Sequence, residues 1–598
     1  MDDLELLRRF EPILRFNRVE LFLPSDTDAY VRACSLWLRT DDGTHVKLLP
    51  AGSLDLDRLA EVGRERHGDT IHLLYVEDPL SRRDFRAWRK AGYGEPMPGS
   101  SRFSQVGILS RIFDALFRLT LLFRGRVPRG SVAAGEITYR DKIAQAGTPY
   151  YGRVMREAGW TILQYWFFYP MNDWRSSFHG INDHEADWEN IILYLSPAAD
   201  GDLVPRWVAF SSHDAEGDGL RRRADDPDLE WVDGHVVAYP GAGSHSHSPR
   251  AMDEAVRVDP PVMRGFINAL RRFLRRITPW TEQSSLDAGL GVPFVDYHRG
   301  DGVAIGPGGD REWQPVLIGD DTPWVRDFSG RWGRDSQDRF GGESAPTGPK
   351  HERDGIDRVR WEDPLGWAGM HKVDPDPRAA EGAVSLRLDE VRRRIAEIDS
   401  RVDAERTEAR QEDAQVRALE QDAITRPIAA ARREQVAARD ASILALRDER
   451  RHLAAEEVAL HEALRDGLPA PAPRAHLGRA AAALDEVEPE PRVRSRLLRI
   501  WAAISTPLII AIVVWLLIGN FTQYYWLGVI VGILVILGVE SLARGRLLAF
   551  LGWAVVVILG ASIVIGLVQE WRLTLAVLLL VGAVVLLTQN LRELRSGG

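Results

Sequence analysis

The chain contains one cysteine, Cys34, in 598 residues. No disulfide can form within it, which is typical of proteins from a reducing compartment. Cys34 stands among apolar residues in the run 31–37, so we expect a buried thiol and not a nucleophile. The formal net charge of −10 is modest for this length. It gives no reason to expect a nucleic-acid partner, which would call for a basic domain or stripe.

Several catalytic signatures are also missing. The sequence has no Gly-x-x-x-x-Gly-Lys-Ser/Thr phosphate loop and no Gly-x-Ser-x-Gly elbow. His184-Glu185 begins like a His-Glu-x-x-His zinc motif, but Trp188 stands where the second histidine would be. The first residues are acidic and no apolar run follows them, so we expect no signal peptide.

Long apolar runs are confined to the C-terminal part. The stretch 501–539 holds no charged residue, and the polar break 519–525 divides it into two runs. Two further runs follow near 547–568 and 573–587. Because a spanning helix needs about 20 apolar residues, we predict an integral membrane protein with a four-helix transmembrane anchor over 496–592. Basic residues flank the runs so that both termini are predicted to be cytoplasmic, with the lipid bilayer as a partner.

The rest of the chain divides by composition into three parts. Residues 1–376 show short strand-like runs separated by turn signals, which predicts a mainly β-sandwich domain with helical insertions. One insertion, 107–126, combines apolar residues with arginines. It is interpreted either as an interfacial helix on anionic lipid or as a helix that packs on the sandwich. Alternating prolines mark the third part, 467–495, as an extended linker.

The second part, 384–466, is predicted to be an α coiled coil. Its apolar residues recur in steps of four and three, and charged residues fill many of the other positions. Pro427 interrupts the pattern, because proline cannot lie inside a regular helix. Two arrangements stay open: two helices that fold back as a hairpin, and one kinked rod that dimerises. Self-association through this segment is therefore expected as one alternative.

Metal-capable side chains gather in the segment 183–189, between an aromatic run at 164–170 and an apolar run at 190–195. If the second strand begins near Asp187, strand alternation places Asp187 and Glu189 on one face and Trp188 in the core on the other. Two further histidine contexts adjoin strand-like runs. The residues that we predict as ligands of a divalent cation are His184, Asp187, Glu189, His213 and His245, with Asp173 as a further oxygen ligand or a turn cap. Such a mixed set of nitrogen and oxygen ligands favours zinc, manganese or iron over calcium, whereas the carboxylates alone would suit calcium or magnesium, and the metal identity stays open.

The order of these blocks resembles the family of proteins related to vacuolar protein sorting protein sixty-two. The blocks are Gln164–Pro170, His184-x-x-Asp187-Trp188-Glu189, Ser211–His213, Tyr239–His245 and Trp361–Pro364. A more distant similarity is to the necrosis- and ethylene-inducing toxins, in which the heptapeptide Gly-His-Arg-His-Asp-Trp-Glu lies on a β-sandwich and helps to hold a divalent cation. This similarity implies that His184, Asp187 and Glu189 are ligands, whereas Asp183, Glu185 and Ala186 differ from the heptapeptide.

Three functions follow as hypotheses from these observations. The first is a membrane-anchored binding or scaffold protein whose cytoplasm-facing β-sandwich carries a divalent cation. The second is a metal-dependent hydrolase, in which the cation activates water and Glu189 or Asp187 acts as the base. The third is a membrane-disrupting effector, suggested by the toxin similarity and the 107–126 segment. No catalytic residue is assigned at this point.

Overall fold

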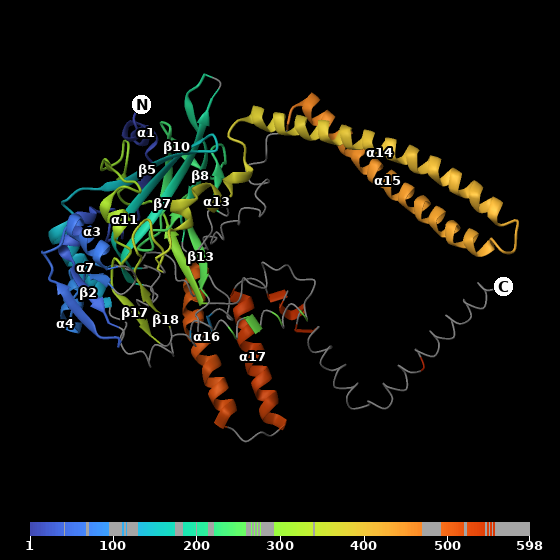
Figure 1. Ribbon diagram of the computed structural model, residues 1–598. Helices are drawn as coiled ribbons and strands as arrows, with labels where there is room; N and C mark the ends of the chain where they lie inside the picture. The colour runs from blue at the N-terminus through green and yellow to red at the C-terminus, as the bar shows by residue number, and fades with distance from the viewer. Residues whose placement is uncertain are drawn as a thin grey trace.

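A computed structural model gives the structure of the chain (Figure 1). It describes residues 1–94, 129–173, 183–212, 220–258, 292–468, 492–518 and 523–543, apart from 41, 67–70, 199, 339–340 and 354, together with scattered residues within 111–115, 265–276 and 547–580.

A six-stranded sheet forms the centre of the N-terminal domain, in the order β16-β5-β6-β7-β8-β9. Neighbouring strands are antiparallel, except that β16 pairs with β5 in parallel. All of β6 is buried, because both faces of the sheet are covered around this central strand. The strand bounds are β5 Pro149–Glu157, β6 Trp160–Asn172, β7 His184–Pro197, β8 Leu203–Phe210, β9 Arg222–Arg223 and β16 Gln314–Leu317.

A five-stranded sheet covers one face of the central sheet. It consists of β10 (Glu230–Val232), β11 (His235–Pro240), β1 (Ile13–Arg15), β15 (Ala304–Ile305) and β12 (His247–Ser248), which pairs with β11. Helix α1 (Asp3–Phe10) contributes to the same core. Alternate residues of β7, such as Ile191 and Leu193, meet Val236 and Ala238 of β11 in this core. The two sheets therefore bury one apolar layer between them.

Helices and a small sheet cover the other face. Here Trp188 of β7 and Phe168 of β6 belong to an aromatic core with Tyr30, Trp324 and Trp332. The covering elements are α2 Thr27–Ala33, α3 Leu56–Glu65, α4 Arg82–Lys90, α7 Arg129–Thr138, η1 Tyr139–Ile143, α11 Pro323–Asp327 and the strands β2 Ser35–Arg39, β3 His45–Leu49 and β4 Ile71–Leu74. Cys34 is buried in this core, as predicted.

The predicted fold class, a mainly β-sandwich domain with helical insertions, is therefore wrong. The domain is a mixed sheet-and-helix domain, because helices form a layer of their own against the central sheet. The aromatic run at 164–170 reflects this arrangement, since a strand that is buried on both faces does not alternate between apolar and polar residues.

Short elements complete the domain. Met370 and Leu365 pack against Ile192 and Tyr194 and close the second face of the central sheet at that end. The remaining bounds are β13 Met252–Val258, β14 Val292–His298, β17 Asp335–Asp338, β18 Gly341–Ser344, α12 Val359–Glu362, α13 Pro364–Trp367 and η2 Met370–Lys372.

Two long helices follow the domain and lie side by side (Figure 1). They are α14 (Pro377–Leu419) and α15 (Arg426–Asp466). Pro427 lies in the first turn of α15, where the missing N–H costs no helical hydrogen bond. Of the two predicted arrangements, the structure has the folded-back hairpin. Its apolar seam joins Ile398 and Val402 of α14 to Ile443 and Leu446 of α15. Self-association through this segment stays a prediction.

The C-terminal part contains α16 (Arg492–Ile518) and α17 (Gln523–Ala543), which also lie side by side (Figure 1). Within the described residues, no helix combines the length and the apolar character that crossing a membrane requires. The predicted four-helix transmembrane anchor over 496–592, and with it an integral membrane protein with cytoplasmic termini, is therefore not what the structure has.

The apolar runs led to a wrong prediction of transmembrane helices. A run of apolar residues shows neither where a helix ends nor what the polar residues within it contact. Glu540 of α17 shows the second point. Its carboxylate lies 2.6 Å from the Arg111 guanidinium and accepts a hydrogen bond from the Trp501 indole at 2.8 Å. The runs near 547–568 and 573–587, the 107–126 segment and most of the 467–495 linker lie largely or wholly outside the described residues.

Candidate functional site

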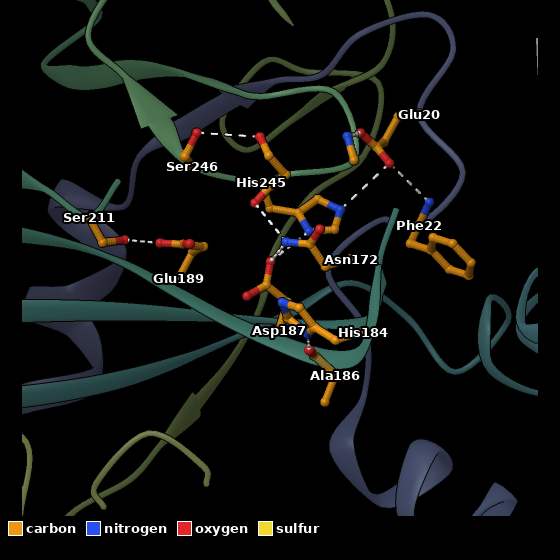
Figure 2. Close-up of polar contacts among 12 residues, drawn as sticks. Glu20, Phe22, Asn172, His184, Ala186, Asp187, Glu189, Ser211, His245 and Ser246 are labelled. Atoms are coloured by element: carbon orange, nitrogen blue, oxygen red, sulfur yellow. Dashed lines mark hydrogen bonds and ion pairs between the residues drawn. The ribbon is translucent and has the colours of Figure 1, made fainter. Parts of the chain in front are cut away.

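The candidate site lies where β7 begins, against the loop between β11 and β12 (Figure 2). Asp187 and Glu189 are buried, and they precede Ile191 on the face that meets the five-stranded sheet. Trp188 lies in the aromatic core on the other face, as predicted. Strand alternation therefore gives the two carboxylates the common face that the sequence predicted.

A backbone irregularity at Ala186 separates a third carboxylate from these two. Ala186 has a φ of 56°, although the residues on either side of it keep one register with β6, Tyr169↔Asp187 and Met171↔Glu185. On a regular strand Glu185 and Asp187 would share a face. Here Glu185 turns to the opposite side, so the segment 183–189 does not present all its carboxylates to one site.

Glu185 is used to hold three chain segments together. Its carboxylate accepts hydrogen bonds from the backbone N–H groups of Tyr75 at 3.0 Å, Val76 at 3.0 Å and Arg334 at 3.1 Å. Burial raises the pKa of Glu185, although the three N–H groups act in the opposite direction. Glu185 therefore anchors β7 to the helical layer.

Asp187 forms the polar centre of the site. One of its oxygens accepts hydrogen bonds from His245 Nδ1 at 2.9 Å and from Asn172 Nδ2 at 3.2 Å. The other ring nitrogen of His245 lies 3.6 Å from Glu20 Oε1, and Glu20 also accepts the Gly243 N–H at 2.9 Å. Figure 2 shows the imidazole between the two carboxylates. Both nitrogens of His245 are thus engaged by acidic side chains.

The His245 ring is held in place by backbone and ring contacts. Its φ is 56°, and its imidazole stacks on the Tyr169 ring with centroids 3.8 Å apart and planes 3° apart. Burial alone would lower the pKa of His245, but hydrogen bonds and charge attraction from Asp187 and Glu20 raise it to about 10. Burial would raise the pKa of Asp187, but His245 and Asn172 lower it. At neutral pH the pair is therefore a buried imidazolium–carboxylate pair.

Glu189 lies farther along the same face. Its carboxylate accepts a hydrogen bond from the Ser211 hydroxyl, and that hydroxyl also accepts the Asn190 N–H at 2.7 Å. Ser211 follows β8 directly, so this contact ties the end of β8 to β7. The Glu189 side chain is oriented by the sheet and not by a flexible loop.

His184 lies at the rim and is half-buried. Its Nδ1 is 2.8 Å from the Ala186 carbonyl oxygen. Because a carbonyl only accepts, Nδ1 carries the hydrogen and Nε2 keeps its lone pair. Burial lowers the pKa of His184, with a partial opposing effect from Asp187, so the ring is neutral at pH 7. A neutral ring of this tautomer has the form that a metal ligand needs.

Asp173 is buried at the end of β6, beside the β11–β12 loop. Its N–H donates to the Gly243 carbonyl at 2.9 Å. Gly243 has a φ of 71°, and a Cβ there would lie 2.2 Å from the Asp173 carboxylate. Glycine is therefore required at 243 for the loop to approach Asp173. The last predicted ligand, His213, lies outside the described residues.

The same loop carries a second set of buried polar groups. The Asp296 carboxylate of β14 accepts hydrogen bonds from the hydroxyls of Ser244 at 2.7 Å and Ser246 at 2.5 Å. His298 donates from Nδ1 to the Tyr239 carbonyl at 2.8 Å. Burial would lower the pKa of His298, but the charges of Asp296 and Glu254 raise it to about 9.

His247 lies near both raised-pKa histidines and is almost fully buried. Burial, followed by the charges of His298 and His245, lowers the pKa of His247 to about 3, so its ring is neutral. Neither ring nitrogen of His247 has a hydrogen-bond partner among the described residues, and the same holds for the Tyr169 hydroxyl. Most buried polar atoms are paired, so both positions are suited to a bound ligand or water.

Sequence reasoning missed several residues of the site. Asn172 lies close to one predicted block and Ser211 lies within another, and hydrogen-bonding side chains near predicted ligands were the available signal. Glu20 is far from the other site residues in the sequence, and nothing in its own segment marks it. The residues that were not predicted as part of the site are Glu20, Tyr169, Asn172 and Ser211, whereas His247 was noted beside His245 but not named as a ligand.

The predicted ligands do not gather into a metal site in the described part of the chain, where no group of three or more His, Cys, Asp or Glu side chains could hold a metal ion. His245 is occupied by Asp187 and Glu20, and it is therefore a positioning residue here rather than a ligand. His184, Asp173 and Glu189 lie in the same region as Asp187, but each is held by contacts of its own.

The chain is similar to known proteins over only a small part of its length. No family model and no curated protein matches the chain. Structures of NLPPya with glucosamine and with mannosamine are 24% identical to it over 17% of its length and 43% of theirs, each with a TM-score of 0.13. A structure described as a toxin fold for microbial attack and plant defence is 18% identical over 17% of this chain and 49% of its own, with a TM-score of 0.12.

The chain thus spans less than half the length of the solved structures that it matches. These are weak neighbours with a toxin-like fold, and TM-scores this low carry no argument about function. No comparison supports the resemblance to the vacuolar sorting family.

Proposed function

We propose that this protein is a binding protein whose mixed sheet-and-helix domain takes up a divalent cation beside Asp187. One observation carries the proposal: buried acidic side chains lie close to the start of β7, and the imidazolium of His245 lies between two of them, Asp187 and Glu20. The acidic residues are Glu20, Asp173, Asp183, Asp187 and Glu189.

Charge is the physical reason for a cationic ligand. Burying a carboxylate is costly unless a cation or hydrogen bonds compensate it. His245 supplies one positive charge to the carboxylates of Asp187 and Glu20. A bound cation would add positive charge to this acidic region, and the ligands that we propose are Asp173, Glu189 and the Nε2 atom of His184, with His213 as predicted from the sequence.

Because the described residues hold no ready set of three ligands, the cation would have to draw its ligands together on binding. The ligands of such a site lose conformational freedom when the cation binds. We therefore expect the cation to bind weakly and reversibly and not to be held permanently. The binding function then depends on cation concentration.

Hydrolysis has less support than binding. A general base works best with a pKa near the working pH, whereas His245 and Asn172 hold the pKa of Asp187 below its ordinary range. The effector hypothesis depends on the 107–126 segment, of which the structure describes only a few residues.

The helical hairpin α14–α15 fits a scaffold role, since it extends the chain without adding to the domain core. A relation to the vacuolar sorting family stays a proposal that rests on motif order.

The test uses the full-length protein and its melting temperature. We expect Ca²⁺, Mg²⁺, Mn²⁺ or Zn²⁺ to raise the melting temperature in a saturable way, because binding to the folded state stabilises it by mass action. Glu189→Gln keeps the acceptor for Ser211 but removes the charge, so the cation effect should be lost. Glu254→Gln, beside His298 in the second polar set, is the matched control and should retain it.

Two outcomes would contradict the proposal. One is a melting temperature that no cation changes, together with no metal in the purified protein by elemental analysis. The other is an equal loss of the cation effect in Glu189→Gln and Glu254→Gln, which would place the cation elsewhere.

A further inference from the structure

Helix α4 carries a basic surface that the candidate site does not involve. The helix begins after Ser81, whose hydroxyl donates to the Asp84 carboxylate at 2.6 Å. Trp88 fixes the helix to α7, because its indole N–H donates to Glu136 at 2.8 Å and its ring is buried. The Phe85 ring stacks beside it with centroids 5.7 Å apart. The helix therefore presents its other side in a fixed orientation.

That other side is hollowed. A hollow of about 510 Å³ is lined by Arg82, Phe85, Arg86, Arg89 and Lys90. The four basic residues are exposed, whereas Phe85 is half-buried. Arg82, Arg86 and Arg89 are spaced by four and three residues, which puts them in one row on a helix of 3.6 residues per turn. We call this surface the α4 basic row.

The acidic residue of the helix lies away from the row. Asp84 is two residues from Arg82 and Arg86, which is about half a helical turn, so it faces the opposite side. Among the described residues, none of the four basic side chains that line the hollow forms an ion pair with a carboxylate. This differs from the hairpin α14–α15, where arginines such as Arg394 and Arg450 pair with acidic residues across the helices.

Like charges that lie close together repel, so four basic side chains without an ion pair to a described residue need an explanation in a chain with a net charge of −10. Solubility does not require it, because the rest of the surface supplies charge. An anionic ligand would remove the repulsion. The guanidinium fork matches phosphate oxygens in paired hydrogen bonds, and a lysine adds a point charge.

We propose that the α4 basic row binds a small ligand that carries two or more phosphate groups. The row from Arg82 to Arg89 is about 10 Å long at 1.5 Å per residue, which exceeds the size of one phosphate. Phe85 offers an apolar surface within the hollow for the non-phosphate part of the ligand. A soluble polyphosphorylated molecule and the headgroup of a phosphorylated lipid share this chemistry.

The first experiment measures binding of inorganic tripolyphosphate to the full-length protein by calorimetry, at about 0.15 M salt. The double variant Arg86→Gln/Arg89→Gln should bind at least about tenfold more weakly, because two charge-assisted contacts are lost. The matched control is Arg401→Gln/Arg410→Gln, which removes two exposed charges from α14 and should bind like the unaltered protein. Far-ultraviolet circular dichroism checks that both variants are folded.

The second experiment distinguishes the two sources of phosphate. Vesicles of phosphatidylcholine with a phosphoinositide are floated with the protein in the presence and absence of tripolyphosphate. Flotation that depends on Arg86 and Arg89 and that tripolyphosphate abolishes would support the proposal with a lipid headgroup as the ligand. Tripolyphosphate binding without flotation would support it with a soluble ligand.

The proposal is overturned if tripolyphosphate gives no saturable heat with the unaltered protein. It is also overturned if both double variants lose the same affinity, because the binding would then follow overall charge and not the α4 basic row. Neither result depends on the cation site, since Asp187 and Glu189 are unchanged in every variant.

Discussion

Charges are used in opposite ways in the mixed sheet-and-helix domain and in the α14–α15 hairpin. In the domain, His245 and Asp187 are buried with 2.9 Å between them. In the hairpin, Arg394 and Glu449 are 2.8 Å apart, but both are exposed. Nearly equal distances therefore join groups in very different surroundings. The attraction between two charges depends on the medium around them, so separation alone does not rank these pairs.

The difference shows which contacts specify structure. Breaking a buried pair leaves one charge without compensation in the interior, whereas water replaces the partner of an exposed charge. We therefore expect the domain to depend on its ion pairs and the hairpin to depend on its apolar seam.

Replacing His245 should have the largest effect. His245→Asn suits the positive φ, because asparagine tolerates that backbone conformation better than most residues. It removes the partner of Asp187 and the stacking on Tyr169, so we expect the free energy of unfolding to fall by about 3–5 kcal/mol in urea denaturation. His235→Asn, at a half-buried histidine with one backbone contact, is the control. A loss of equal size in the control would contradict the special role of His245.

The pair should also give the domain a defined pH window. The folded pKa of His245, about 10, lies above the unfolded value of about 6.5, so its contribution is complete below pH 6.5 and is lost as the pH rises to 10. The folded pKa of Asp187 is lowered, so its contribution is present above the unfolded value of about 3.9 and is lost as the pH falls through the folded value. Unfolding at pH 5–10 should show an alkaline decline that His245→Asn reduces.

In the hairpin, the seam should matter more than the charges. Ile398 is 1% exposed, and Ile398→Ala should lower the stability of the hairpin by about 2 kcal/mol, because it removes buried apolar contacts and leaves a cavity. Leu444→Ala is the matched control, since Leu444 is 65% exposed. The measurement is the loss of helical circular dichroism on heating. Similar effects in both variants would mean that the seam does not stabilise the hairpin.

Replacing an exposed hairpin arginine should have the smallest effect. Arg394→Gln breaks the contacts to Glu449 and Glu397, yet solvent screens both. We expect no resolvable change in melting temperature, and none when salt is raised to about 1 M, where the Debye length is roughly 3 Å. A clear decrease would show that the charges of the hairpin act as a network.

Local patterns in the sequence carried the local structure well. Alternation placed Asp187 opposite Trp188, and the steps of four and three in 384–466 predicted the helices, although they left the hairpin and the kinked rod both open. These features depend on residues that are near each other in the chain. The covering of the central sheet did not follow from such patterns, because its second face is packed by elements from several distant segments.

The candidate site was recognised in part for the same reason. Asp187 and His245 were both named, but as joint ligands of a cation rather than as partners of each other. The positive φ of Ala186 could not be read from alanine, and it determines that Glu185 leaves the site. Glu20 reaches His245 only through the tertiary fold. The apolar runs of the C-terminal part gave a clear but wrong expectation, because hydropathy does not report polar contacts such as that of Glu540.

The contacts of Glu185 have a consequence for the order of folding. One carboxylate joins positions 109 to 149 residues away from it in the chain. Long loops must close before such contacts form, so we expect these contacts to be made late in folding. The start of β7 should therefore reach its final form only after the segments at 75–76 and 334 have docked. Hydrogen exchange at the Tyr75, Val76 and Arg334 amides would then report one shared opening event. Protection of these three amides during refolding would mark the point at which the domain is complete.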